Sequence, residues 1–398
     1  MANLYPGSQT IIYTQIESTY GTPRHPSGGR SMYTITESLE GAEERELRPD
    51  RSGNADHQSR YIGRKSASWE ITKLVLPNGT AGTQPDDCHL WEVGFGAASV
   101  GGTAVEYQLA TLPSTSLTIR RGVRAGEGAA GSSDFQDHVI GAICNRVEVT
   151  WGQQGNNGLA QVVFAGESKE YGHTGNTSIK VTGAGETIGA GTTGVSLDQV
   201  LAVSPHSAIL IGGDTGGGSG ILVDTANYTS GRISWSETLD GTLSHGDVVK
   251  PYNPTASTSG SPIHARIGQL SIDGGSTTIK HMGGRVTMED NRTLLNEEVG
   301  SDSATQVLRT DRRNTTFALD FIMKADETWL LGDVRRNQQK NIEIIIGDVV
   351  GERLMLTLPV AEFDFTPAEI PEQEVARISL EGRGLQNLGN DSVKAKFF

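Results

Sequence analysis

The sequence predicts a mainly β protein with two tandem β-sandwich or barrel domains of one kind, each with one short α-helix, and a small inserted all-β domain. Two observations predict this fold class. The 398-residue chain has 51 glycines and recurring Ser, Thr, Asn and Asp clusters, a composition typical of many short strands joined by turns. Patterned segments also occur twice in the same order, which at this length predicts more than one domain.

The first repeated segment is a strand preceded by basic residues. Residues 64–71 read RKSASWEI, and residues 312–319 read RRNTTFAL, 248 positions further along the chain. Gln58 and Gln306 match at the same offset. Apolar residues then recur at alternate positions in both copies. This pattern predicts a strand with one buried face, on which Trp69 faces the core.

A second match predicts one hairpin in each copy. VEVT at residues 147–150 matches FDFT at 363–366, and AQVVFAGES at 160–168 matches ARISLEGRG at 376–384, both 216 positions apart. A turn region of equal length joins the two segments in each copy. The smaller offset places 32 extra residues in turn-rich loops of the first copy, where insertions cost little stability.

One short helix is predicted in each copy, at residues 85–94 and 325–338. Both segments open with acidic residues, the first closes with glycine, and the second carries two arginines near its end. Acidic starts, basic ends and a closing glycine are all favourable for a helix. We expect both helices to close one open end of a sandwich.

The stretch between the copies is rich in Gly, Ser and Thr, and its short β-like runs match neither copy. It ends in TASTSGSP, a composition typical of a flexible linker. We interpret it as an inserted β-domain of about 80 residues. The expected organisation is an N-terminal arm at residues 1–30, a first sandwich at 31–173, the inserted domain and linker at 174–261, a second sandwich at 262–390 and a C-terminal tail at 391–398.

Composition excludes several classes. The net charge of −14 is opposite to that of proteins that hold nucleic acid by phosphate contacts. The sequence has no apolar run of membrane-spanning length and no signal-peptide pattern, so we expect a protein made in the cytoplasm without membrane insertion. Cys88 and Cys144 do not make a disulfide framework and are expected to be free, buried thiols.

No local motif supports catalysis. GAGTTG at residues 189–194 has the spacing of a dinucleotide-binding loop but lacks the strand and helix that such a loop needs. A single Asp-Thr-Gly at residues 214–216 cannot make an aspartic-protease dyad. The nine histidines are scattered without metal-ligand spacing. We therefore expect no enzyme activity, no cofactor and no metal.

Two charged stretches precede the repeated strands, at residues 40–65 (the first arm) and 288–313 (the second arm). An idle solvated loop is the alternative, but both exceed an ordinary hairpin connection and occur at the same place in each copy. Mixed charges suit contacts between identical subunits, so we expect assembly arms. The candidate assembly residues are Glu43, Glu44, Arg45, Glu46, Arg48, Asp50, Arg51, Glu289, Asp290, Arg292, Glu297, Glu298 and Asp302, and the arm–strand junctions are Arg64, Lys65, Arg312 and Arg313.

Several of these segments resemble the major tail tube proteins of long-tailed (siphovirus-like) bacteriophages, of the duplicated two-domain type. The resemblance covers residues 31–171 and 263–390. It is carried by the arm and strand EVGSDSATQVLRTDRRNTTFALDFIMK, the helix ADETWLLGD, the strands NIEIIIGDVVGERLMLTLPVAEFDF and the hairpin EQEVARISLEGRGLQ.

The resemblance implies a structural protein of the virion tail, assembled in the bacterial cytoplasm. Homotrimers would form pseudo-hexameric rings that stack through the arms around a channel. Genomic DNA would pass through a negatively charged lumen without specific binding, which agrees with the acidic net charge. Further partners would be the tape measure, tail terminator and distal tail proteins. The inserted domain departs from the minimal pattern and would decorate the outer surface.

Two alternatives stay open. A distal tail or tail-terminator protein shares the fold but caps the tube once. A tandem β-sandwich adhesin or carbohydrate-binding protein belongs to another class and would be expected to carry a signal peptide and exposed aromatic platforms. The chain has five tryptophans, of which Trp69 and Trp91 lie at core-like positions.

Overall fold

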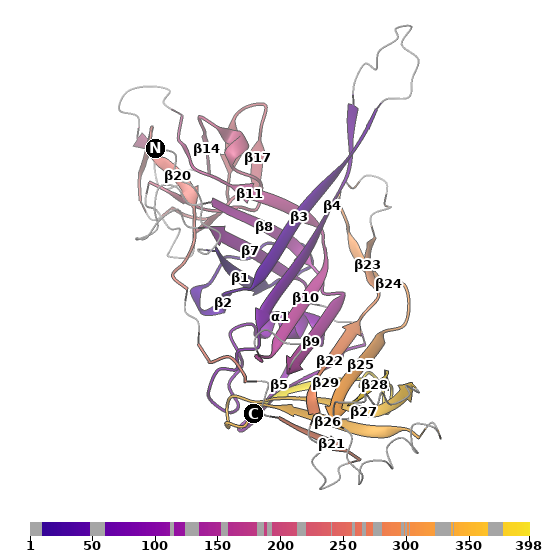
Figure 1. The fold of residues 1–398 in the computed structure, drawn as a ribbon. Coiled ribbons are helices and arrows are strands. Elements are labelled where there is room, and N and C mark those ends of the chain that lie inside the picture. Colours follow the sequence, from indigo (N-terminus) through magenta and orange to yellow (C-terminus); the bar gives the residue numbers. More distant parts are fainter. Residues whose placement is uncertain are drawn as a thin grey trace.

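In the computed structural model, the part of the chain that is described is mainly antiparallel β-structure, as predicted, and it contains one α-helix (Figure 1). The described residues are 10–47, 60–111, 115–123, 135–152, 158–180, 187–188, 193–212, 220–239, 241–256, 259–264, 268–273, 281–295, 298, 301, 303–322, 336, 338–364 and 377–398.

A large sheet runs through most of the molecule. Its strands follow one another in space in the order β3 (Thr36–Leu47), β4 (Arg60–Leu74), β10 (Gln161–Ser168), β9 (Arg146–Gly152), β22 (His281–Glu289), β25 (Asn314–Ile322), β28 (Arg377–Leu385), β27 (Leu354–Asp364), β29 (Lys394–Phe397), β6 (Ala104–Gln108) and β5 (Ala98–Gly101). On its other side, β27 pairs with β26 (Lys340–Ile346), which pairs with β21 (Gly268–Ile272).

A smaller sheet covers the first part of the large one. Its order is β11 (Glu170–Thr174), β8 (Phe135–Ala142), β7 (Leu117–Val123), β1 (Thr10–Ile16) and β2 (Ser31–Met32). Side chains of both layers meet in one buried cluster that includes Ile119 and Val139 from the small sheet and Trp69 and Phe164 from the large sheet. The small sheet and strands β3, β4, β10 and β9 thus form two packed layers, which we call the sandwich.

The strand order of this sandwich recurs later in the chain. The run β3, β4, β10, β9 has the same order as β22, β25, β28 and the second part of β27, and β11, β8, β7, β1 has the same order as β29, the first part of β27, β26 and β21. In the first copy residues 143–145 separate β8 from β9, whereas β27 continues through both layers. The two predicted hairpins are confirmed as the pairs β9–β10 and β27–β28.

The helix predicted at residues 85–94 is confirmed as α1 (Cys88–Gly94). Trp91 is fully buried and packs against Phe95, Tyr107, Phe164 and Phe397. Replacing a tryptophan in such a core with alanine typically costs about 3–5 kcal/mol. The second predicted helix, at 325–338, lies almost entirely outside the described residues.

Both chain ends that were expected to be an arm and a tail contain strands of the sheets. Strand β1 lies between β2 and β7 in the small sheet, and β29 pairs with β27 and β6 in the large one. Ala395 and Phe397 alternate with two lysines and are buried, which explains why this short polar-looking segment forms a strand. Cys88 and Cys144 are free and buried, as predicted.

The stretch predicted as an inserted domain (residues 174–261, the insert) consists mainly of short β-strands in its described parts, with one 3-10 helix at Val200–Ala202, and has its own hydrophobic cluster, which includes Trp235. Its strands are β12 (Thr177–Ser178), β13 (Thr187–Ile188), β14 (Gly194–Ser196), β15 (Ala208–Ile211), β16 (Ile221–Leu222), β17 (Thr225–Asn227), β18 (Arg232–Ser234), β19 (Leu243–Ser244) and β20 (Val248–Pro251).

The insert contacts the outer side of the small sheet through buried polar groups. Arg120 Nη2 donates to the carbonyl of His206 at 2.8 Å, and Gln136 Nε2 donates to the carbonyl of Tyr252 at 2.9 Å. The segment expected to be a flexible linker also has partners, because Ser259 Oγ donates to Asp86 Oδ1 at 2.9 Å. The insert is therefore held against the sandwich through its middle, at His206, and through its C-terminal part, at Tyr252 and Ser259.

Candidate assembly surface

One face of the large sheet is covered by side chains that alternate with the buried core residues. Its rows can be followed across both strand runs: Thr150, Arg285, Ala318, Glu381 and Asp364 lie side by side on β9, β22, β25, β28 and β27. Residues on the other face of the same strands, such as Val149 and Phe317, are buried. We call this solvent-facing surface, from β3 to β27, the open face.

The open face is acidic. Its acidic side chains clearly outnumber its basic ones, and Arg146 is already paired with Glu70 at 3.0 Å. A surface with this balance repels phosphate groups rather than binding them. Among the side chains that the structure describes on this face, the acidic residues include Glu40, Glu70, Glu148, Glu289, Asp320, Glu362, Asp364 and Glu381, and the basic ones include Arg146, Arg285 and Arg383.

The two strand runs are joined edge to edge. Strand β9, which ends the first run, pairs antiparallel with β22, which begins the second. Val147 lies opposite Met288, and Arg146 lies opposite Glu289. Buried residues of both strands continue one core across the junction, so the two copies form one sheet rather than two separate ones.

The outer edges of the two runs are equivalent to the two edges that meet at the β9–β22 junction, because β3 corresponds to β22 and the second part of β27 corresponds to β9. Strand β3 begins the strand order and, among the described strands, pairs only with β4. At the other end, β28 lies along one side of Val360–Asp364, while β26 reaches only as far as Ala361 on the opposite side. Unpaired edges of this kind are sites for pairing with another strand.

The first arm is an extension of the β3–β4 hairpin. Pairing continues outward to Leu47 opposite Arg60, with a bulge between Glu43 and Arg45. In Figure 1 this pair extends well beyond the sandwich. A protruding two-stranded ribbon cannot bury its own surface, and such ribbons depend on packing against something else for stability.

The second arm folds back onto the first copy. Its strands β23 (Arg292–Leu295) and β24 (Gln306–Arg309) pair with each other, and Leu294 packs against Ile143 in a small buried cluster. The two arms occupy equivalent places in the strand order but have different conformations.

A buried ion-pair cluster anchors the second arm. Asp290 is fully buried and accepts hydrogen bonds from Arg309 Nη2 at 2.6 Å and Arg313 Nε at 3.0 Å, while Arg292 Nε lies 2.7 Å from its other carboxylate oxygen as an ion pair. Arg292 Nη2 also donates to the carbonyls of Val93, at 3.0 Å, and Cys144. Burial lowers the pKa of Arg292, while the Asp290 carboxylate opposes this effect.

The structure thus gives the predicted arm residues different environments. Asp290 and Arg292 are buried inside the chain, because three guanidinium groups share one carboxylate, and their side chains offer no exposed contact surface. Glu289, Glu298 and Arg312 are exposed. The remaining candidates are described only as backbone in β3 and β4 (Glu43, Glu44, Arg45, Glu46 and Arg64) or lie outside the described residues (Arg48, Asp50, Arg51, Glu297 and Asp302).

Arg313, which the sequence analysis placed at an arm–strand junction, lies between β24 and β25, and sequence reasoning missed its neighbour Arg309. It also missed the sheet edges, because no local pattern states which strands pair.

Comparison of the sequence with protein-family models and with curated proteins finds no match. None of the helices in the described ranges is long and apolar enough to cross a membrane. In the same ranges, no group of three or more His, Cys, Asp or Glu side chains is arranged to hold a metal ion.

Proposed function

We propose that the chain is a structural protein, the major tail tube subunit of a long-tailed bacteriophage, and that it forms stacked trimeric, pseudo-hexameric rings around a channel for DNA. One observation carries the proposal. The chain contains two strand runs of the same order, joined head to tail through β9 and β22, and its ends present the same pair of edges. A contact between chains that repeats the internal junction is heterologous. Such a contact builds a closed ring when the rotations between successive chains add up to one full turn.

The open face supports the channel part of the proposal. In a ring closed through the sheet edges, this face lines the inside and the cores lie outside. An acidic lining allows DNA to pass because it gives the phosphates nothing to bind. The solvent-facing position of Glu381 and Asp364, on adjacent strands of the second run, suits this role.

The internal junction predicts the register between chains. Leu39 lies opposite Trp69, and Val286 lies opposite Phe317, the counterpart of Trp69. Gly41 of β3 is therefore the counterpart of Met288 in β22, and Phe363 of β27 is the counterpart of Val147 in β9. Because Val147 pairs with Met288, Phe363 of one chain should lie opposite Gly41 of the next.

A disulfide cross-link tests this register. In the double variant Ala42→Cys/Glu362→Cys, the introduced thiols should lie opposite each other, and mild oxidation should give covalent trimers. The matched control Ser38→Cys/Glu362→Cys moves one thiol four residues along β3, about 13 Å, which is too far for a disulfide. Equal cross-linking of the two variants, or none in assembled protein, would contradict the register.

Negative-stain microscopy of the purified protein tests the function itself. Long tubes with a regular axial repeat are expected. Single rings without stacking would favour the distal tail or tail-terminator alternative. A monodisperse monomer at high concentration would contradict the proposal and favour the tandem adhesin.

A further inference from the structure

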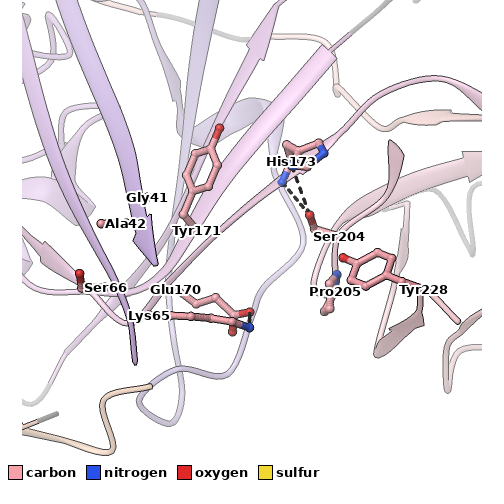
Figure 2. Close-up of a pocket in the computed structure, with 10 residues that line it drawn as sticks. All are labelled: Gly41, Ala42, Lys65, Ser66, Glu170, Tyr171, His173, Ser204, Pro205 and Tyr228. Atoms are coloured by element: carbon pink, nitrogen blue, oxygen red, sulfur yellow. Dashed lines mark hydrogen bonds and ion pairs between the residues drawn. The ribbon is translucent and has the colours of Figure 1, made fainter. Parts of the chain in front are cut away.

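A cleft of about 640 Å³ lies between the root of the first arm, strand β11 and the insert (Figure 2). Lys65 and Ser66 line it from the arm root, and Tyr228 lines it from the insert. Lys65 Nζ lies 3.5 Å from Glu170 Oε1 at the start of β11. The cleft is thus bounded by the same element, β3–β4, whose edge is proposed to join the next chain.

Part of the edge of β11 opens into this cleft. The insert covers the later part of that edge, because Ser204 N donates to the carbonyl of His173 at 3.0 Å and Gly175 N donates to the carbonyl of Ala202 at 2.7 Å. Outward-facing backbone groups alternate along a strand, so the N–H and C=O of Tyr171 point the same way as those of His173. Tyr171 itself lines the cleft.

The equivalent place in the second copy is filled. There, β29 is the counterpart of β11, and the first copy adds strand β6 to its outer edge, with Ala395 opposite Tyr107. The segment then continues past the root of the second arm, where Arg313 Nη2 donates to the carbonyl of Ala110 at 2.9 Å. Arg313 is the counterpart of Lys65, since both stand at the same position of the repeated strand.

We propose that the cleft receives an extended segment of a second copy of this chain, which adds to the open edge of β11 as β6 adds to β29. Lys65 donates to a backbone carbonyl of that segment, as Arg313 does to Ala110. The proposal rests on the proposed function, because the neighbour that reaches the cleft is the one whose second strand run pairs with β3. It goes further by assigning a second contact, on the other layer of the sandwich.

Thiol labelling of the full-length protein tests this contact. Cys88 and Cys144 are buried at 1% and 0% exposure, so the maleimide reaction reports on an introduced cysteine. Ser66→Cys places a thiol in the cleft with a small change in volume. The matched control Ser68→Cys lies two residues further along β4 and does not line the cleft.

Microscopy establishes first whether tubes form, and their absence would refute the proposed function. In tubes, the labelling rate of Ser66→Cys should fall at least 10-fold relative to unassembled protein, while that of Ser68→Cys changes little. If tubes form and Ser66→Cys reacts as fast in them as in unassembled protein, the second contact is refuted and the proposed function stands. Full tube yield from Ser66→Trp, which would fill the cleft, would also refute it.

Discussion

Replacing Asp290 with asparagine should destabilise the root of the second arm by about 3 kcal/mol. Asp290 is fully buried, and Arg292, whose side chain is 1% exposed, depends on it for a partner of opposite charge. Breaking a buried pair by removing one partner typically costs about 3–5 kcal/mol. The lower end applies here because Arg292 keeps the carbonyls of Val93 and Cys144 as acceptors.

The free energy of unfolding can be measured by urea titration with tryptophan fluorescence, and hydrogen exchange in β23 and β24 gives a local measure. The double variant Asp290→Asn/Arg292→Met should recover most of the loss, because it removes the unpaired buried charge as well. Asp311→Asn, an exposed acidic residue nearby, serves as the control and should change little. A loss below about 1 kcal/mol for Asp290→Asn, or an additive loss in the double variant, would refute the reasoning.

Three further predictions follow from the cleft, the insert and the open face. Lys65→Met should lower tube yield at equal protein concentration while leaving the thermal unfolding midpoint of the unassembled chain nearly unchanged; an unchanged yield would contradict the role of Lys65. Burial lowers the pKa of His138 well below 6.5, so the unfolded chain binds a proton that the folded chain does not, and stability present at neutral pH should fall as the pH drops below about 6.5. His138→Gln should flatten this dependence in thermal unfolding between pH 7 and pH 5, and an identical slope in both proteins would rule it out. Glu289→Lys/Glu381→Lys tubes should retain DNA in a salt-sensitive manner in a co-sedimentation assay, whereas wild-type tubes should not; equal retention would contradict an acidic lumen.

The elements that were predictable from sequence are those with a local signal. Trp69 and Phe317 alternate with polar residues, and this period of two is sufficient to identify strands β4 and β25 and the face that each buries. The helix α1 has its acidic start and closing glycine within ten residues. Repetition at a constant offset then relates the two sets of strands without any knowledge of their contacts.

Pairing between distant strands was not predictable, because it depends on surfaces that no local pattern describes. Nothing in residues 146–152 or 281–289 indicates that β9 and β22 meet. The two arms show the same limit. Both are runs of mixed charge. In the second arm, Asp290, Asn291 at a positive φ of 35° and Arg292 form a turn that points both charges inward. Burial of such a pair is a tertiary property that composition does not reveal.

In the proposed ring, the β9–β22 junction lies within a single chain. Only every second contact between strand runs therefore requires two molecules to meet. Each such contact that is made within one chain avoids the loss of translational and rotational freedom that association otherwise costs. Fusion also removes a constraint of exact six-fold symmetry, under which all positions of a ring must be identical. The chain can therefore carry its insert, and its two differently folded arms, at alternate positions around the channel.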